Sequence, residues 1–150
     1  WGKASANSSA LPTLIVFGHL AGLLLAGGTA IVLDRATLRV SSGSTDERLR
    51  QLDALHAGHR WVIGGLALSA LTGVLLLTAD IETYFASVVF WTKMGLIVLL
   101  LVNGYVMTRT ERGARTTPDG ARWNALRSRA ITSLVLWFAV VLAGVALVNS

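Results

Sequence analysis

The chain of 150 residues is too apolar and too poor in charge for an ordinary soluble domain. Hydrophobic residues make up 53% of it and charged residues 14%, with a mean hydropathy of +0.62, whereas charged residues are about a quarter of a typical soluble domain. The absence of cysteine excludes disulfides, thiolate metal sites and cysteine catalysis.

The positive charge follows the pattern of a membrane protein. The pI is near 10.8 and the net charge is +5, but five arginines lie in residues 34–60 and six more in residues 109–129. Both segments are short and stand between apolar stretches, so membrane topology explains their charge. Nucleic acid is therefore not an expected partner.

The chain begins with a polar segment, residues 1–10, which we expect to be an extramembrane tail. It starts without methionine, as a processed or incomplete chain does, and it lacks a signal-peptide layout. Residues 11–33 are the first predicted span, since a spanning helix needs about 20 mostly apolar residues. Small residues at helical spacing give this span a smooth face, where another backbone or a flat cofactor can lie close; they are Gly18, Gly22, Ala26 and Ala30. His19 shares that face.

Residues 34–60 are predicted to lie at the membrane surface. Asp34 and Arg35 mark the interface after the first span. Ser44 and Glu47 have the spacing of a capping box, and the leucines that follow repeat at helical spacing, at Leu49, Leu52 and Leu55. We therefore expect a short amphipathic helix that runs straight into the second span.

The second span is predicted at residues 61–79 and has a close-packing face of its own. That face consists of Gly65, Ser69, Thr72 and Gly73. The acidic segment 80–84 is long enough only for a tight connection. The second and third spans are therefore expected to form an antiparallel hairpin.

The third predicted span, residues 85–107, carries Lys93 and Asn103 among apolar neighbours. Polar groups inside a spanning helix face protein or water rather than lipid, so this helix must have an inward side. After the arginine-rich segment 109–129, with a turn at 118–120, residues 130–148 form the fourth span and include Ser133.

The predicted fold is an all-α integral membrane four-helix bundle, with residues 11–150 as one transmembrane domain. Short loops rich in Lys and Arg stay on the cytoplasmic side. The first and third loops are therefore predicted to be cytoplasmic, and both termini are predicted to face outward. The expected location is the bacterial inner membrane.

Depth along the spans suggests two polar groupings. His19, Thr72 and Lys93 each lie eight residues from the outer end of their span, which is about 12 Å of helix. With Gly22, they form a candidate cofactor-binding set. Asn103 and Ser133 lie near the inner ends of their spans and are expected to form a structural hydrogen-bonded pair.

Two interpretations of Lys93 stay open. Its ammonium group either extends toward the outer interface, where Asp80 and Glu82 lie, or lines a pocket with His19 for an anionic or quinone-like ligand. No acidic residue is expected within any span, which favours a ligand as the counter-charge and disfavours a proton pump with a buried carboxylate relay.

The three histidines raise the question of haem, because imidazole is an axial ligand of haem iron. His19 lies about 21 Å of helix from the cytoplasmic end of its own span. His56 and His59 lie at or beyond the cytoplasmic end. Binding of one iron by two histidines is therefore not expected, while a tetrapyrrole on His19 alone stays open. Asp53, His56 and His59 share one helix face, but we interpret them as a head-group-facing patch and predict no metal site.

Several short motifs carry a resemblance to a known group of proteins. They are Gly-His-Leu-Ala-Gly at 18–22, Asp34, His59-Arg60-Trp61, Thr72-Gly73, Phe90-Trp91-Thr92-Lys93-Met94, Asn103-Gly104, and Ser133 with Trp137. In these motifs the chain resembles an uncharacterised family of bacterial four-helix inner-membrane proteins, which are loosely similar in layout to copper-resistance D-type and b-type cytochrome membrane domains. The resemblance implies the fold and the location and carries no settled activity.

We expect an accessory or assembly subunit without catalysis of its own, which packs through its small-residue faces against a larger membrane complex or against itself. The alternative is an electron-transfer membrane protein that binds a tetrapyrrole, such as haem, or a quinone through His19. A small transporter comes third, since no internal repeat is visible. The expected partners are the lipid bilayer and other membrane subunits.

Overall fold

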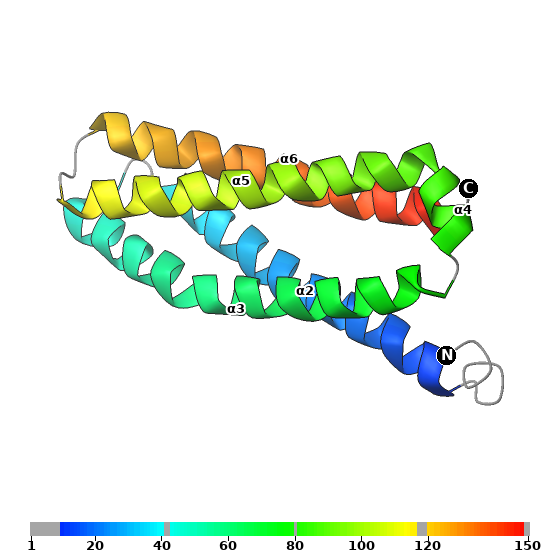
Figure 1. The fold of residues 1–150 in the computed structure, drawn as a ribbon. Helices are drawn as coiled ribbons and strands as arrows, with labels where there is room; N and C mark the ends of the chain where they lie inside the picture. Colours follow the sequence, from blue (N-terminus) through cyan, green and yellow to red (C-terminus); the bar gives the residue numbers. More distant parts are fainter. Residues whose placement is uncertain (1–9, 41–42, 80, 117–119, 149–150) are drawn as a thin grey trace.

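The computed structural model describes residues 10–40, 43–79, 81–116 and 120–148. Within these ranges the chain forms five helices and no strand (Figure 1): α2 Ala10–Arg39, α3 Thr45–Leu77, α4 Ile81–Ala86, α5 Val88–Thr116 and α6 Gly120–Val148. All except α4 are long and apolar enough to cross a membrane. The prediction of an all-helical protein with four helices long and apolar enough to span a membrane is thus confirmed.

The four long helices extend well beyond the predicted spans. They contain 30, 33, 29 and 29 residues, which corresponds to about 44 to 50 Å of helix, whereas a bilayer core is about 30 Å thick. The prediction of a surface loop at 109–129 is therefore wrong in extent, because most of that segment is helical. In the segment 34–60, α2 continues to Arg39, and the predicted amphipathic helix that leads into the second span is present. Arginine is a good helix former, so charge ends a membrane span without ending a helix.

The predicted start of α3 is confirmed in atomic detail. The Ser44 backbone N–H donates to Glu47 Oε2 over 2.8 Å, and the Glu47 backbone N–H donates to Ser44 Oγ over 3.3 Å. This reciprocal pair is a capping box. From there α3 continues without a break to Leu77, so the amphipathic segment and the second span are one helix.

The connection between α3 and α5 differs from the predicted tight loop. It contains the short helix α4, and Ser87 separates α4 from α5, so the third long helix begins at Val88 and not at Phe85. Local bonds hold this corner: the Trp91 indole N–H donates to the Phe85 carbonyl over 3.1 Å, and Ser87 Oγ accepts from the Phe90 backbone N–H over 3.4 Å.

The long helices pack as two pairs. α2 lies along α3, α5 lies along α6, and α2 also contacts α6. In the chain, α3 and α5 are separated by the short helix α4. They form the two arms of the predicted hairpin, but they contact each other only sparsely. Figure 1 shows α4 and the end of α6 at one end of the bundle, and the end of α2, the start of α3, the end of α5 and the start of α6 at the other, arginine-rich end.

The contact between α2 and α3 uses the small-residue faces predicted from the sequence. A Cβ atom placed on Gly22 would lie 2.7 Å from the Gly65 carbonyl oxygen and 2.7 Å from the Ser69 backbone nitrogen. One placed on Gly65 would lie 2.6 Å from the Ala26 backbone nitrogen. The two backbones thus meet directly, which is how small residues drive helix association in lipid.

Two buried clusters lie along the bundle. The membrane core consists of Ala26, Ala30, Leu100, Trp137 and Val140. The second cluster, which we call the stem core, lies toward the arginine-rich end and consists of Leu52, Leu55, Ala114, Trp123 and Leu126. The stem core comes from segments that the hydropathy pattern alone assigns to loops, and it makes the helical extensions a packed unit.

Candidate functional site

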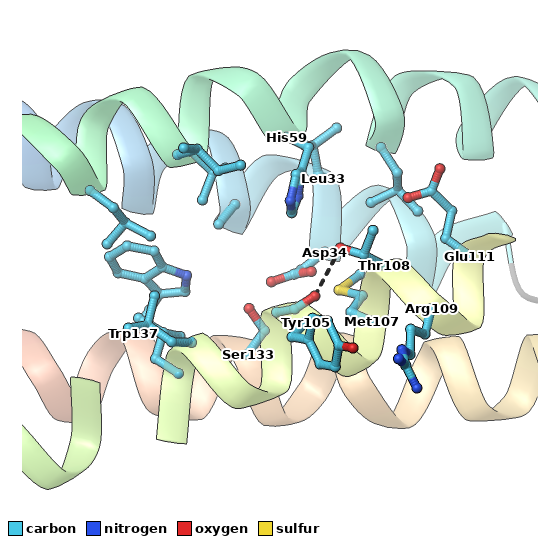
Figure 2. A pocket seen from close by; sticks show the side chains of 18 of the residues that line it. Leu33, Asp34, His59, Tyr105, Met107, Thr108, Arg109, Glu111, Ser133 and Trp137 are labelled. Carbon is cyan, nitrogen blue, oxygen red and sulfur yellow. Dashed lines mark hydrogen bonds between the residues drawn. The ribbon is translucent and has the colours of Figure 1, made fainter. Parts of the chain in front are cut away.

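A cavity of about 480 Å³ lies between the membrane core and the stem core. All four long helices line it, and it is located where α3 and α5 have little contact. Its apolar wall includes Ala30, Val62, Leu66, Leu100 and Trp137, and its polar lining includes Asp34, His59, Thr108, Glu111 and Ser133. Figure 2 shows His59 pointing toward Asp34 from one side of the cavity, with Ser133 on the other side.

Asp34 is the most deeply buried charged side chain of this cavity. It is 2% exposed, and its Oδ2 atom has no hydrogen-bond partner among the residues that the structure describes. Ser133, across the cavity on α6, is the side chain that interacts with the carboxyl group (Figure 2). The prediction that Asp34 marks the membrane interface stays a prediction. The structure adds that the Asp34 side chain is buried and that α2 continues past it to Arg39.

The sequence does contain a signal for Asp34. Gly22, Ala26, Ala30 and Asp34 follow one another at intervals of four residues, so the carboxyl group continues the face of α2 that packs inward. The hydropathy pattern hides this continuity, because it ends the span at the first charge.

His59 and Glu111 bring two more titratable groups to the cavity. His59 projects into it from α3 in Figure 2. Glu111, on α5, is 6% exposed, and its Oε1 atom lies 3.4 Å from Arg115 Nη2 and 3.9 Å from His56 Nδ1. Glu111 therefore has a cationic neighbour on its own helix, unlike Asp34.

Arg115 also ties α5 to α3 at the arginine-rich end. Its Nη2 donates to the Leu52 carbonyl over 2.6 Å and its Nη1 to Asp53 Oδ1 over 2.8 Å. Because α3 and α5 touch so little elsewhere, these bonds are a main link between the two helices.

Replacement of Arg115 by glutamine is expected to lower the free energy of unfolding by about 1 to 3 kcal/mol. The change leaves the Glu111 carboxylate buried without its nearest cation, and unpaired buried charges cost this much or more. Thermal unfolding in detergent measures the loss. Arg127→Gln, at an exposed position of α6, is the control, and equal losses for the two variants would contradict this role of Arg115.

The predicted cofactor residues on α2 and α3 do come together. His19 Nδ1 lies 2.9 Å from the Ser69 carbonyl oxygen and 3.3 Å from Ser69 Oγ. Gly22 faces the Gly65 backbone at a distance that leaves no room for an added methyl group, and a Cβ atom on Gly18 would lie 3.1 Å from Thr72 Cγ2, a tight contact. This grouping is a packed helix contact, and the cavity lies elsewhere, around Asp34.

Lys93 lies on α5 and faces Gly144 of α6. It is within electrostatic range of His19, and among the described residues it forms no ion pair. Asp80 lies outside the described residues. Both interpretations of Lys93 thus stay predictions.

Asn103 and Ser133 are both buried, on α5 and α6, but no direct bond joins them. The Asn103 side-chain amide donates to the Arg129 carbonyl over 3.1 Å, while Ser133 faces Asp34. Asn103 thus fastens α5 to the backbone of α6. Its Oδ1 atom is buried without a hydrogen-bond partner among the described residues.

The histidine patch on α3 separates in the structure. Asp53 pairs with Arg115, His56 faces Glu111, and His59 lines the cavity. Within the described ranges no group of three His, Cys, Asp or Glu side chains is placed to hold a metal ion.

No model of a known protein family, no curated protein and no solved structure matches this chain. The site has therefore to be interpreted from its own geometry.

Proposed function

We propose that this chain is a multi-pass protein of the bacterial inner membrane that binds a small amphiphilic molecule in the cavity between its two helix pairs. The positive-inside rule favours an orientation with the arginine-rich end, and hence the stem core, on the cytoplasmic side. In that orientation the cavity lies toward the cytoplasmic face, where an amphiphile has both lipid and water nearby.

The cavity has the properties of a ligand site. Its volume of about 480 Å³ lies within the range of roughly 300 to 1,000 Å³ that is usual for small-molecule sites, and an apolar wall with a few convergent polar groups is typical of them. The observation that carries the proposal is the buried Asp34 carboxyl group, whose Oδ2 atom has no hydrogen-bond partner in the described chain. A ligand group supplies the missing partner.

The accessory-subunit hypothesis remains a prediction with less support. It rests on small-residue faces that attract another helix, and in the structure the faces of α2 and α3 are packed against each other. Co-purification with other membrane subunits tests it.

One observation favours a tetrapyrrole on His19 as a second candidate. Nδ1 bonded to the Ser69 carbonyl must carry the proton, which leaves the Nε2 lone pair for a metal, as in many histidine ligands. The edge of the His19 ring packs against Gly73, which restricts the space for a tetrapyrrole on the side of the ring that faces α3. A visible absorption spectrum of gently extracted protein, oxidised and reduced, tests this candidate.

Filling the cavity is expected to abolish ligand retention. A Cβ atom on Gly104 meets no atom within 4 Å, and Gly104 lines the cavity, so Gly104→Leu places a large side chain there without a backbone clash. Native mass spectrometry of the purified chain should show a small molecule bound to the wild type and absent from this variant.

Gly95→Leu is the matched control, because Gly95 is also on α5 and also open, but lies outside the cavity lining. It should keep the bound molecule. Retention by both variants, or by neither, would contradict a binding site in this cavity.

A further inference from the structure

The charges around Asp34 leave its carboxyl group without a cation. The groups that line the cavity with it are His59 on α3, Tyr105, Arg109, Glu111 and Arg112 on α5, and Ser133 and Trp137 on α6. No ion pair to Asp34 is found among the described residues. Ser133 and Trp137 carry no charge, so the α6 residues that line the cavity supply no counter-ion.

The two lining arginines are located at the exposed side of the site. The Arg109 guanidinium lies over the Tyr105 ring, 4.8 Å from its centroid, and both Arg109 and Arg112 are exposed. Asp34 is 2% exposed. The innermost charge of the cavity is therefore negative and unneutralised by the chain.

A buried carboxyl group in this position requires either a proton or a cation. An isolated carboxylate is strongly disfavoured away from water, and inside a membrane such groups pair with another charge or mark a pathway for one. The Trp137 ring lines the same cavity, and aromatic faces attract cations. These features together select a positively charged occupant.

The occupant must also be lipophilic. Ile63, Leu101 and Tyr105 line the cavity although each is more than half exposed on the bundle surface, at 54%, 52% and 59%. They belong to α3 and α5, the helices that touch only sparsely. The cavity therefore borders the surface that faces lipid.

We propose that Asp34 holds the cationic head of a lipophilic ammonium or similar organic cation, and holds a proton when that cation is absent. This inference rests on the proposed function, since it concerns the same cavity. Proton and cation compete for one carboxyl group, so binding of the cation to the protonated protein releases one proton. In the acid range, the affinity for the cation then falls tenfold for each unit by which the pH is lowered, as competition with a single proton requires.

The test uses the full chain in nanodiscs and two probes of the same shape and opposite charge, tetraphenylphosphonium and tetraphenylborate. Equilibrium dialysis against empty nanodiscs corrects for partition into lipid. We expect saturable binding of one tetraphenylphosphonium per chain and no saturable binding of tetraphenylborate. Addition of tetraphenylphosphonium to weakly buffered acidic protein should release close to one proton per bound cation.

Asp34→Asn keeps the shape of the side chain and removes its charge. It is expected to weaken tetraphenylphosphonium binding at least tenfold and to remove the pH dependence. His59→Gln is expected to leave the pH dependence in place, which separates the carboxyl group from the histidine that faces it. Circular dichroism and gel filtration establish that both variants are folded.

The outcomes separate this inference from the proposal beneath it. Equal affinity for the two probes, pH dependence that survives in Asp34→Asn, or pH dependence that disappears in His59→Gln would overturn the role of Asp34. If Gly104→Leu blocks binding while Asp34→Asn does not, the cavity binds a ligand and only its proposed charge is wrong. If Gly104→Leu and Gly95→Leu bind tetraphenylphosphonium equally, the cavity is not the site and both proposals fail.

Discussion

Replacement of Gly65 by alanine is expected to lower the free energy of unfolding by about 3 kcal/mol, the upper part of the usual range for overpacking. The added Cβ atom would lie 2.6 Å from both the Ala26 backbone nitrogen and the Gly22 carbonyl oxygen. Neither atom can rotate away as a side chain does, so α2 and α3 must separate along their whole contact. Unfolding in detergent, followed by circular dichroism, measures the loss.

Gly64→Ala is the matched control for this experiment. Gly64 is the preceding residue of the same helix, and a Cβ atom there meets nothing within 4 Å. Both substitutions gain the same helix propensity, about 1 kcal/mol in favour of alanine. The difference between their free energies of unfolding therefore reports the contact between α2 and α3 alone. Equal stability of the two variants would show that the close approach of the backbones does not hold the pair together.

Replacement of Trp123 by alanine is expected to cost about 3 to 5 kcal/mol, as usual for a buried tryptophan. Trp123 is 4% exposed in the stem core, and the Arg48 guanidinium lies 5.4 Å from its ring centroid. Its loss opens the arginine-rich end of the bundle. Trypsin, which cuts after arginine, should then cleave this end at lower temperature than in the wild type.

Trp61→Ala serves as the comparison, because Trp61 is 52% exposed and has Arg60 over its ring in a similar way. It removes the same side chain from a surface position and should change trypsin sensitivity little. The opposite ranking of the two variants would mean that the stem is not a packed unit.

The sequence predicts the architecture because the bilayer imposes a simple rule. Apolar stretches of about 20 residues must be helices, and the small residues at 22 and 65 mark where two of those helices meet. The capping box at Ser44 is equally local, since three residues contain all of its information. These features depend on neighbours in the chain, and the structure confirms them.

The ends of the helices and the cavity depend on distant residues and could not be predicted in the same way. Hydropathy measures transfer into lipid, so it assigns the stem residue Trp123 to a loop. Leucine spacing predicts a helix at Leu52 but not that this helix packs with Trp123 in one buried cluster. The four-residue spacing that ends at Asp34 indicates an inward face, but the sequence does not show what lies opposite the carboxyl group. The packing of α6 brings Ser133 there.

The stem has a consequence for how this protein loses its structure. In the proposed membrane placement, the stem core is buried from water, which drives its association, while α2 and α3 meet in lipid, where packing replaces that driving force. Urea weakens burial from water. We therefore expect the arginine-rich end to unfold in urea at concentrations at which the membrane half stays helical.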